Sequence, residues 1–335
     1  MTDRIFSSSA LSTGADGAFA QAIRHAICRI PGVDEASSAH VVGLLSDMSI
    51  MSLLALSAYL MLLVGRISFG QQAFFGVGAY ASGMLTAMFQ VPLAYALIGG
   101  VICGALCSWI LAFPTMRLSG LYYAVATLAF GEMSRILLGW LYWQIQTPDG
   151  LVGPFGIEGF RDIRWLLEND IAPEVYLALT VLILSAILLL MIFSEHTRFG
   201  LALRMTGHDD VLSTSQAIPV TRIRLAAATL AGGLAALGGG LYAHRVTYIE
   251  PALFDPMLGV HAVGYALIGG LGTAFGPLLG VIFDLGLLDA SRLVPGWRMV
   301  IFGGLVALFL RWRPRGFLDE ITVHRLRVMM KLRRP

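Results

Sequence analysis

Stretches of roughly twenty apolar residues recur along almost the whole chain, and they constrain its fold more than any other feature, because a membrane-spanning helix needs about that length. Charged residues make up only 13% of the 335 residues, whereas a soluble domain carries about 25%. The sequence therefore predicts an all-α, polytopic transmembrane helix bundle with about eight or nine membrane segments. It argues against a soluble enzyme, a disordered protein and a nucleic-acid binder. The stretches are 41–64, 70–89, 92–113, 118–140, 175–193, 223–243, 257–271, 276–291 and 297–310.

Two of these regions differ from ordinary spans. Residues 66–89 follow their neighbour without a real loop, and residues 257–271 form a short apolar piece. A broken or re-entrant helix is tolerated at membrane depth where protein or a cavity covers it. Nine full spans would place the two ends of the chain on opposite sides of the membrane, and eight spans plus one re-entrant piece would place both inside. We favour the second arrangement.

The distribution of charge predicts the orientation. Arginines gather in the loop 194–224 and in the tail 313–335, whereas acidic residues outnumber basic ones in 141–174. Because cytoplasmic loops carry the excess of basic residues, we expect 194–224 and the C-terminus to be cytoplasmic and 141–174 to be external. The chain then divides into a polar N-terminal extension (1–38), a membrane domain (39–312) and a basic cytoplasmic tail (313–335).

The residue inventory excludes several kinds of chemistry. Lysine occurs once, at Lys331, and no G-x-x-x-x-G-K-[ST] motif is present, so we expect no P-loop ATPase in this chain. Cys103 and Cys107 lie four residues apart on one helix face, which fits either half of a metal site or simple packing. We favour packing, because no His or carboxylate accompanies them. We expect no catalytic residues, no metal and no cofactor.

Few charges lie within the apolar stretches. Glu132 and Arg135 are three residues apart and can pair on one helix face. Such a pair could serve as a gate or solute contact, or it could be purely structural. We favour the structural interpretation. We interpret Asp284 and His261 as polar groups satisfied within the bundle. No chain of Asp, Glu and His crosses the bilayer, which argues against a proton-coupled carrier.

The loop 194–224 contains two pieces with helical character, Gly200–Met205 and Asp209–Ala217, which we expect to be broken at Gly207. Two acidic residues in the first turn of the second piece suit its dipole, and Pro219 ends it. A short helix between two spans can bind a partner protein, but an ordinary solvated loop would look similar. The residues alone leave both interpretations open.

Six segments, taken in order over roughly residues 42–320, carry a resemblance to a known family. The chain resembles the inner-membrane permease subunits of branched-chain amino acid ABC importers, specifically the LivM type. The first two segments read GRISFGQQAFFGVGAY (65–80) and RLSGLYYAVATLAFGE (117–132). The others are the loop 200–225, AGGLAALGGGLYA (231–243), IGGLGTAFGPLLG (268–280) and RPRG (313–316).

The resemblance implies a multi-pass protein of the bacterial inner membrane that works in a complex. A periplasmic binding protein would deliver the solute, a second, LivH-like permease would complete the pathway, and two cytoplasmic ATPases would bind ATP and drive alternating access. The solute would be a branched-chain amino acid or a related amino acid or amide. Relatives also carry urea, short amides or aromatic acids, and the external segment 147–153 is only loosely family-like, so the solute stays open.

The resemblance also implies positions for the functional residues. The helix within 200–217 would couple to an ATPase through Arg204, Gly207, His208, Asp209, Asp210 and Ala217. Four residues would lie near the pathway by motif position alone, namely Gln71, Tyr122, Thr127 and Glu132. The sequence departs from the common family pattern at 207–210, which reads GHDD in place of REDE, and at 216–218, which reads QAI in place of LGI. These departures put the choice of ATPase partner in doubt.

Two other function classes remain as alternatives. A secondary carrier or channel without an ATPase would need an ion or proton path, which the sequence lacks. An integral-membrane enzyme would need a paired acid–base or metal constellation, and no such motif is present.

Overall fold

The computed structural model describes residues 35–118, 120–147, 150–289, 300, 301, 303, 304, 307, 308 and 311. The predicted polar extension lies almost entirely outside the described residues, as does the basic tail 313–335. The last predicted membrane stretch, 297–310, is covered only at scattered helical positions.

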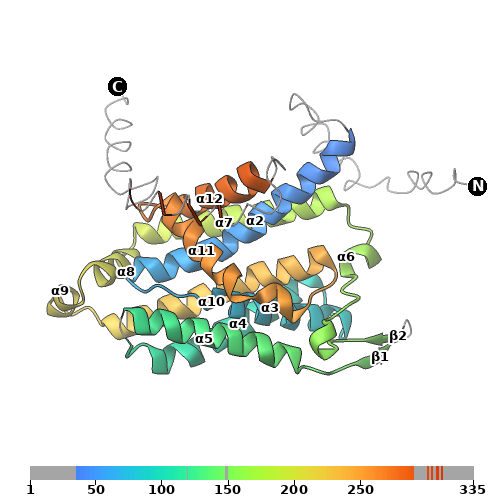
Figure 1. The fold of residues 1–335 in the computed structure, drawn as a ribbon, viewed down its shortest axis with the longest axis horizontal. Coiled ribbons are helices and arrows are strands. Elements are labelled where there is room, and N and C mark those ends of the chain that lie inside the picture. The colour runs from blue at the N-terminus through green and yellow to red at the C-terminus, as the bar shows by residue number, and fades with distance from the viewer. Residues whose placement is uncertain are drawn as a thin grey trace, which may run out of the picture.

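Four long apolar helices form the frame of the molecule: α2 (Glu35–Leu63), α4 (Leu93–Thr115), α7 (Pro173–Glu195) and α10 (Val220–Val246). Each is long and apolar enough to cross a membrane. They run roughly along the long axis of the molecule (Figure 1). The prediction of a helical membrane bundle is confirmed for the described residues. The count of eight or nine segments is not, because four of the described helices meet the length and composition of a span.

The connections lie at the two ends of this frame. After α5 (Leu121–Gly139), the chain forms an antiparallel hairpin of β1 (Ile145–Thr147) and β2 (Gly150–Val152), and then the 3-10 turn η1 (Gly156–Glu158) and α6 (Trp165–Glu168). The short helices α8 (Arg198–His208) and α9 (Asp210–Ser215) lie at the opposite end (Figure 1). The hairpin is an element that the all-α prediction missed. The two loops therefore lie at opposite ends of the described bundle, and the side of the membrane that each one faces stays a prediction.

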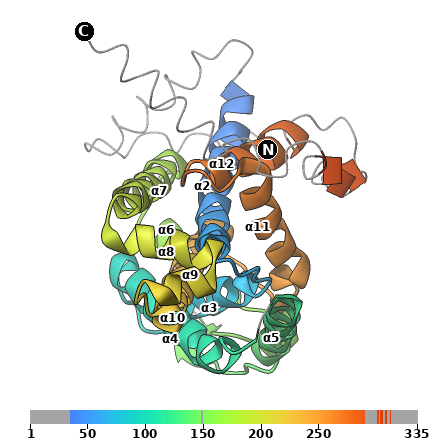
Figure 2. The ribbon, with the colours of Figure 1, turned by 90° about the vertical axis from the view of Figure 1, so that its left-hand side faces the viewer.

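Small residues allow α10 to pack closely against α3 (Gln71–Ala87). A Cβ atom at Gly239 would overlap the carbonyl oxygen of Phe75, and one at Gly78 would overlap the backbone of Ala236. Membrane helices gain stability from such close backbone approach, because lipid provides no hydrophobic force between helices. In the view along the bundle, α7 and α4 lie on one side and α5 and α11 on the other, with α2 and α3 between them (Figure 2).

Helix α3 begins inside the bundle rather than at its end. The chain leaves α2 at Leu63 and continues through the non-helical segment 64–70. The hydroxyl of Ser57, almost two turns before the end of α2, donates to Oε1 of Gln71 at 3.3 Å. The Phe69 N–H likewise donates to Oγ1 of Thr127, in the second turn of α5, at 3.1 Å. With 17 residues, α3 is about 25 Å long, which is shorter than the hydrocarbon core of a bilayer.

Helix α11 (Pro256–Gly269) also begins inside the bundle, but the chain enters it from the hairpin end. The segment before it starts at the hairpin end, where Ile249 exchanges two backbone hydrogen bonds with Phe160. It continues through the 3-10 turn η2 (Pro251–Phe254), and Phe254 packs against Phe75 of α3. Both regions that the sequence identified as candidates for a re-entrant or broken piece therefore begin within the bundle.

After α11 the chain forms α12 (Gly276–Val281) and continues as the π-helical segment η3 (Ile282–Asp289). Asp284 in this segment is buried, and the Tyr265 hydroxyl donates to its Oδ2 at 2.7 Å. The ring of His261 stacks on the same tyrosine. Asp284 therefore has a hydrogen-bond partner within the bundle, as predicted, and His261 contacts the same tyrosine through its ring.

Candidate functional site

The loop between α7 and α10 forms the two helices that the sequence predicts, but the break lies elsewhere. Helix α8 continues through Gly207 to His208, and the chain is extended at Asp209. Oδ1 of Asp209 accepts the backbone N–H groups of Val211 at 2.8 Å and Leu212 at 3.1 Å, and thereby caps α9. The expectation of a break at Gly207 was wrong, because the capping side chain, and not the glycine, separates the helices.

Gly207 instead allows α8 to dock on the end of α2. A Cβ atom there would overlap the carbonyl oxygen of Leu63, and a Cβ atom at Gly65 would lie 2.9 Å from the Gly207 carbonyl oxygen. The two glycines therefore hold the backbones of the α8–α9 loop and of segment 64–70 in direct contact. Movement of α8 would be transmitted to the segment that leads into α3.

A group of arginine contacts strengthens this connection. Asp210 at the start of α9 pairs with Arg224 of α10 at 2.5 Å, and Nε of Arg224 donates to the Val64 carbonyl oxygen at 3.4 Å. Arg66 donates to the carbonyl oxygen of Leu118 and lies over the ring of Tyr123. These contacts link α9 to segment 64–70 and to the start of α5.

A second cluster lies where α7 meets α8. Oε1 of Glu195 accepts the hydroxyl of Tyr59 at 3.0 Å and the N–H of Ala274 at 3.1 Å, and it pairs with Arg204 at 3.2 Å. Arg204 also donates to the carbonyl oxygen of Gly272 at 3.0 Å. The side chains of Glu195 and Arg204 are only 9% and 19% exposed. This cluster joins α2, α7, α8 and the turn after α11.

The six residues predicted to couple to an ATPase thus occupy different places. Arg204, Gly207 and Asp210 contact the rest of the bundle, whereas Asp209 caps α9. His208 is exposed at the end of α8. Ala217 has a left-handed backbone (φ 60°), and its N–H donates to the carbonyl oxygen of Thr214, so it ends the turn that follows α9.

The four residues predicted to lie near the pathway divide into two pairs. Tyr122 and Glu132 lie on the outward side of α5, where Tyr122 is 77% exposed. Glu132 accepts two hydrogen bonds from Arg135, at 2.9 and 2.5 Å, and both side chains are about one third exposed. An exposed ion pair on a membrane helix needs water or another protein beside it, because hydrocarbon does not solvate charge.

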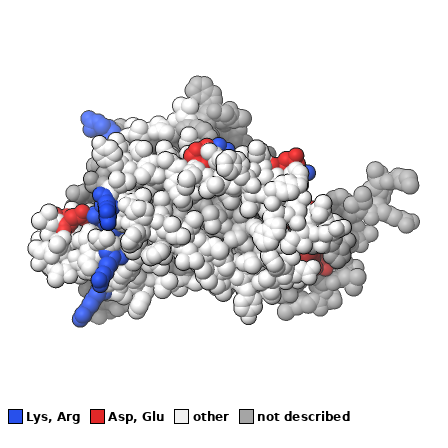
Figure 3. All heavy atoms as spheres, turned by 90° about the horizontal axis from the view of Figure 1, so that it is seen from below, with Lys and Arg blue, Asp and Glu red and all other residues white. Residues whose placement is uncertain are grey.

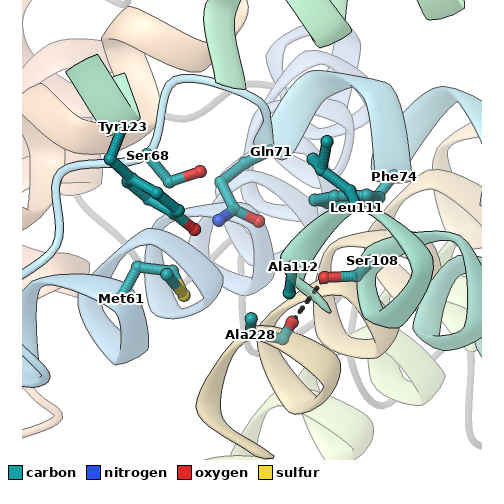
Figure 4. A pocket seen from close by; sticks show the side chains of 9 residues that line it. All are labelled: Met61, Ser68, Gln71, Phe74, Ser108, Leu111, Ala112, Tyr123 and Ala228. Carbon is teal, nitrogen blue, oxygen red and sulfur yellow. Dashed lines mark hydrogen bonds between the residues drawn. The ribbon is translucent and has the colours of Figure 1, made fainter. Parts of the chain in front are cut away.

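Gln71 and Thr127 are buried on the other side, where α3 and α5 meet. Gln71 also borders a small cavity of about 10 Å³, close to the space that one water molecule needs. Figure 4 shows the side chains of Ser68, Gln71 and Tyr123 around this cavity, beside the hydrogen bond from Ser108 to the carbonyl oxygen of Ala228. The structure does not bring the four predicted residues together around one point.

Several functional candidates were missed by the sequence reasoning. Gln72 is fully buried, and neither polar atom of its amide has a hydrogen-bond partner among the described residues. Glu195 and Arg224 were seen only as charges of a loop, and the pair between Asp47 of α2 and Arg245 of α10 was not foreseen. Nothing in the sequence connects positions so far apart. No group of three or more His, Cys, Asp or Glu that could hold a metal occurs in the part of the chain that the structure describes.

The hairpin end carries an open hollow of about 390 Å³ on its surface. Arg161, Asp162, Arg164 and Tyr248 line it, with Arg161 over the ring of Tyr248 and Arg164 paired with Asp162 at 2.5 Å. On the face seen in Figure 3, basic side chains gather near the α8–α9 end and the middle is largely uncharged. Charged side chains thus occur at both ends of the described bundle.

Comparison with known proteins places the chain among transport permeases. The profile of a family described as "Branched-chain amino acid transport system / permease component" matches residues 40–310. The high-affinity branched-chain amino acid transport system permease protein LivM of Escherichia coli (strain K12) is 28% identical, and that of Salmonella typhimurium is 27% identical, each over 76% of this chain and 64% of the relative. The autoinducer 2 import system permease protein LsrC of Salmonella typhi is 26% identical over 78% of this chain and 74% of its own length. The chain thus spans about two thirds of the length of the LivM relatives, and no solved structure matches it.

Proposed function

This chain belongs to the family of branched-chain amino acid transport permeases, and from that premise we propose that it is one permease subunit of an ATP-driven importer. Its solute is a small polar molecule, a branched-chain amino acid or a related amino acid or amide. ATP is bound by partner subunits, and the chain itself performs no catalysis. The family match over 271 of the 335 residues (40–310) is the observation that carries this proposal.

The contacts of the α8–α9 loop support the role of a coupling element. Asp210, Arg224 and Gly207 tie the loop to segment 64–70, which leads directly into α3. A force applied to α9 by a cytoplasmic ATPase would therefore reach a helix that begins inside the membrane. Such a chain of packed contacts is what alternating access requires.

The outward side of α5 supports a place for the pathway. Exposing the charges of Glu132 and Arg135 to lipid would cost free energy, so this side faces either water or a second permease subunit. We propose that a LivH-like partner covers α5 and that the solute passes between the two subunits. Tyr122 and Glu132 would then line the pathway, and Gln71 and Thr127 would hold the start of α3 behind it.

The two polar ends support the remaining partners. The arginine-rich α8–α9 end is proposed to be cytoplasmic, and with it the C-terminus, in keeping with the positive-inside rule. The hollow with Arg161 and Arg164 would face the periplasm and receive a solute-binding protein. The protein would accordingly lie in a bacterial inner membrane.

Reconstitution tests the proposed function. Vesicles that contain this chain, its cognate second permease and ATPases, with the binding protein added, are expected to take up radiolabelled L-leucine or L-valine only when ATP is present. An ATPase variant that binds but cannot hydrolyse ATP is the control. Uptake that continues without any ATPase would favour the alternative, a secondary carrier or channel.

Loss of the α9 cap is expected to weaken coupling. Asp209→Ala removes the acceptor for two backbone N–H groups, and a lost N-cap costs about 1 kcal/mol, so α9 should fray and ATP-driven uptake should fall several-fold. Asp209→Asn keeps a capping oxygen and should retain most of the uptake. Equal uptake by both variants and the wild type would contradict a role for α9.

A further inference from the structure

The side chain of Gln72 occupies an unusual position for an amide. It is fully buried, yet its Nε2 and its Oε1 both lack a hydrogen-bond partner among the described residues. Buried polar atoms in native proteins nearly always have a partner, and leaving them without one costs free energy. An amide that lacks partners on both atoms in one state of a transporter is a candidate for a ligand contact in another state.

Two glycines leave the room that the Gln72 amide occupies. A Cβ atom at Gly131 of α5 would overlap Nε2 of Gln72, and one at Gly259 of α11 would overlap its Oε1. The same Cβ at Gly259 would overlap the carbonyl oxygen of Phe69. The amide therefore lies between two glycines, one on each neighbouring helix.

The N-termini of two short helices meet at the same place. Gln72 is the second residue of α3, and Gly259 lies in the first turn of α11. Asp255 caps α11 by accepting the N–H of Leu258 at 3.0 Å, whereas no side chain caps α3. The first N–H groups of a helix have no acceptor within it and carry partial positive charge, so the start of α3 favours an anionic group. In transporters, half-helix N-termini at membrane depth are known to face anionic parts of substrates.

Helix α5 forms one of the two walls that cover the Gln72 amide, and α11 forms the other. Helix α5 lies at the edge of the bundle, beside α3 and α11 (Figure 2). Glu132 directly follows Gly131, so the outward side of α5 carries the partly exposed ion pair while the adjacent buried side contacts Gln72. A displacement of α5 away from α3 would open Gln72 and the α3 N-terminus to the proposed pathway.

We propose that Gln72 and the uncapped N-terminus of α3 form the contact for the carboxylate end of an amino-acid solute during transport. The Nε2 group donates to the carboxylate, and the Oε1 atom is free to accept from the ammonium group of the same solute. This inference rests on the proposed function, and it adds a solute-contacting residue and the chemical group that it recognises.

Substitution at Gln72 tests the contact in the complete reconstituted complex. Gln72→Leu is expected to lower uptake of L-leucine at least about ten-fold, which corresponds to about 1.4 kcal/mol. The thermal stability of the complex should stay the same or rise, because an apolar side chain needs no partner there. Gln72→Asn keeps an amide and should retain more uptake than Gln72→Leu.

Tyr80→Phe is the matched control, because the Tyr80 hydroxyl is also buried on α3 and has no hydrogen-bond partner among the described residues, while its ring packs against Phe160 and Phe254. It should transport as the wild type does. Wild-type uptake by Gln72→Leu would overturn the proposal. So would a loss of uptake that is matched by a loss of thermal stability, or by an equal loss in Tyr80→Phe, since both indicate a structural role.

Thiol labelling separates this inference from the proposed function and does not depend on transport by the Leu variant. In a chain whose Cys28, Cys103 and Cys107 are replaced by Ser, the Gln72→Cys thiol should react with a small cationic methanethiosulfonate when ATP is present, and L-leucine should slow the reaction. The thiol of Ala231→Cys, buried on α10, should stay unreactive. If uptake is normal but the two thiols behave alike, the contact is wrong. If leucine protects Gln72→Cys but the wild type shows no ATP-driven uptake, the proposed function is wrong and the contact stands.

Discussion

Replacing Arg224 by alanine is expected to lower ATP-driven uptake about ten-fold or more while the complex still assembles, because coupling free energies between sites are typically about 1–3 kcal/mol. The Arg224 side chain is only 10% exposed, and it joins Asp210 of α9 to the carbonyl oxygen of Val64. Without it, α9 loses its direct connection to the segment that leads into α3. The partner ATPases should continue to hydrolyse ATP, so the ratio of solute transported to ATP consumed is the quantity to measure.

Arg222 provides a matched control for this experiment. It lies two residues earlier on the same helix, carries the same charge and is exposed. Arg222→Ala should leave the transport ratio close to that of the wild type. If both variants lose uptake equally, the effect comes from the net charge of the α8–α9 end. If neither variant loses uptake, the contacts of Arg224 do not transmit the movement of α9.

The sequence was sufficient for the frame of the fold, because the length of an apolar stretch directly limits the structure it can form in lipid. The predicted spans 175–193 and 223–243 lie within α7 and α10, and the span 92–113 begins one residue before α4. The sequence identified 66–89 only as a candidate for a re-entrant or broken helix, and the point in the bundle at which α3 begins could not be predicted. It depends on hydrogen bonds of Gln71 and Phe69 to two other helices, and no local pattern encodes such contacts.

In the candidate site, too, local features could be predicted from the sequence, and features that depend on distant residues could not. The sequence placed Asp209 and Asp210 in the first turn of the second helix, where acidic residues suit the helix dipole, and in the structure Asp210 begins α9 while Asp209 caps it. Gln72 and Glu195 were missed because their meaning comes from residues that are distant in the sequence. Tyr59, for example, lies 136 positions from the carboxylate that its hydroxyl contacts. An unpartnered amide is likewise invisible until its neighbours are known.

The largest loss of stability is expected from Glu195→Ala. This substitution removes the acceptor for Tyr59 and Ala274 and the carboxylate partner of Arg204, all in a largely buried cluster. Breaking a buried pair by removing one partner costs about 3–5 kcal/mol, since the remaining charge keeps its cost of burial. The unfolding temperature of the detergent-solubilised chain should fall by about 5–10 °C.

Three comparisons show whether the buried pair is the cause. Glu195→Gln keeps an oxygen that can accept from Tyr59 and Ala274, so it should lose less stability than Glu195→Ala. Glu168→Ala removes an exposed carboxylate on α6 and should have little effect. In the double variant with Arg204→Ala, the two losses should be clearly less than additive, because the second substitution removes the guanidinium that the first left without its carboxylate. Strictly additive losses would mean that Glu195 and Arg204 act independently, and that the cluster does not hold α7, α8 and the turn after α11 as one unit.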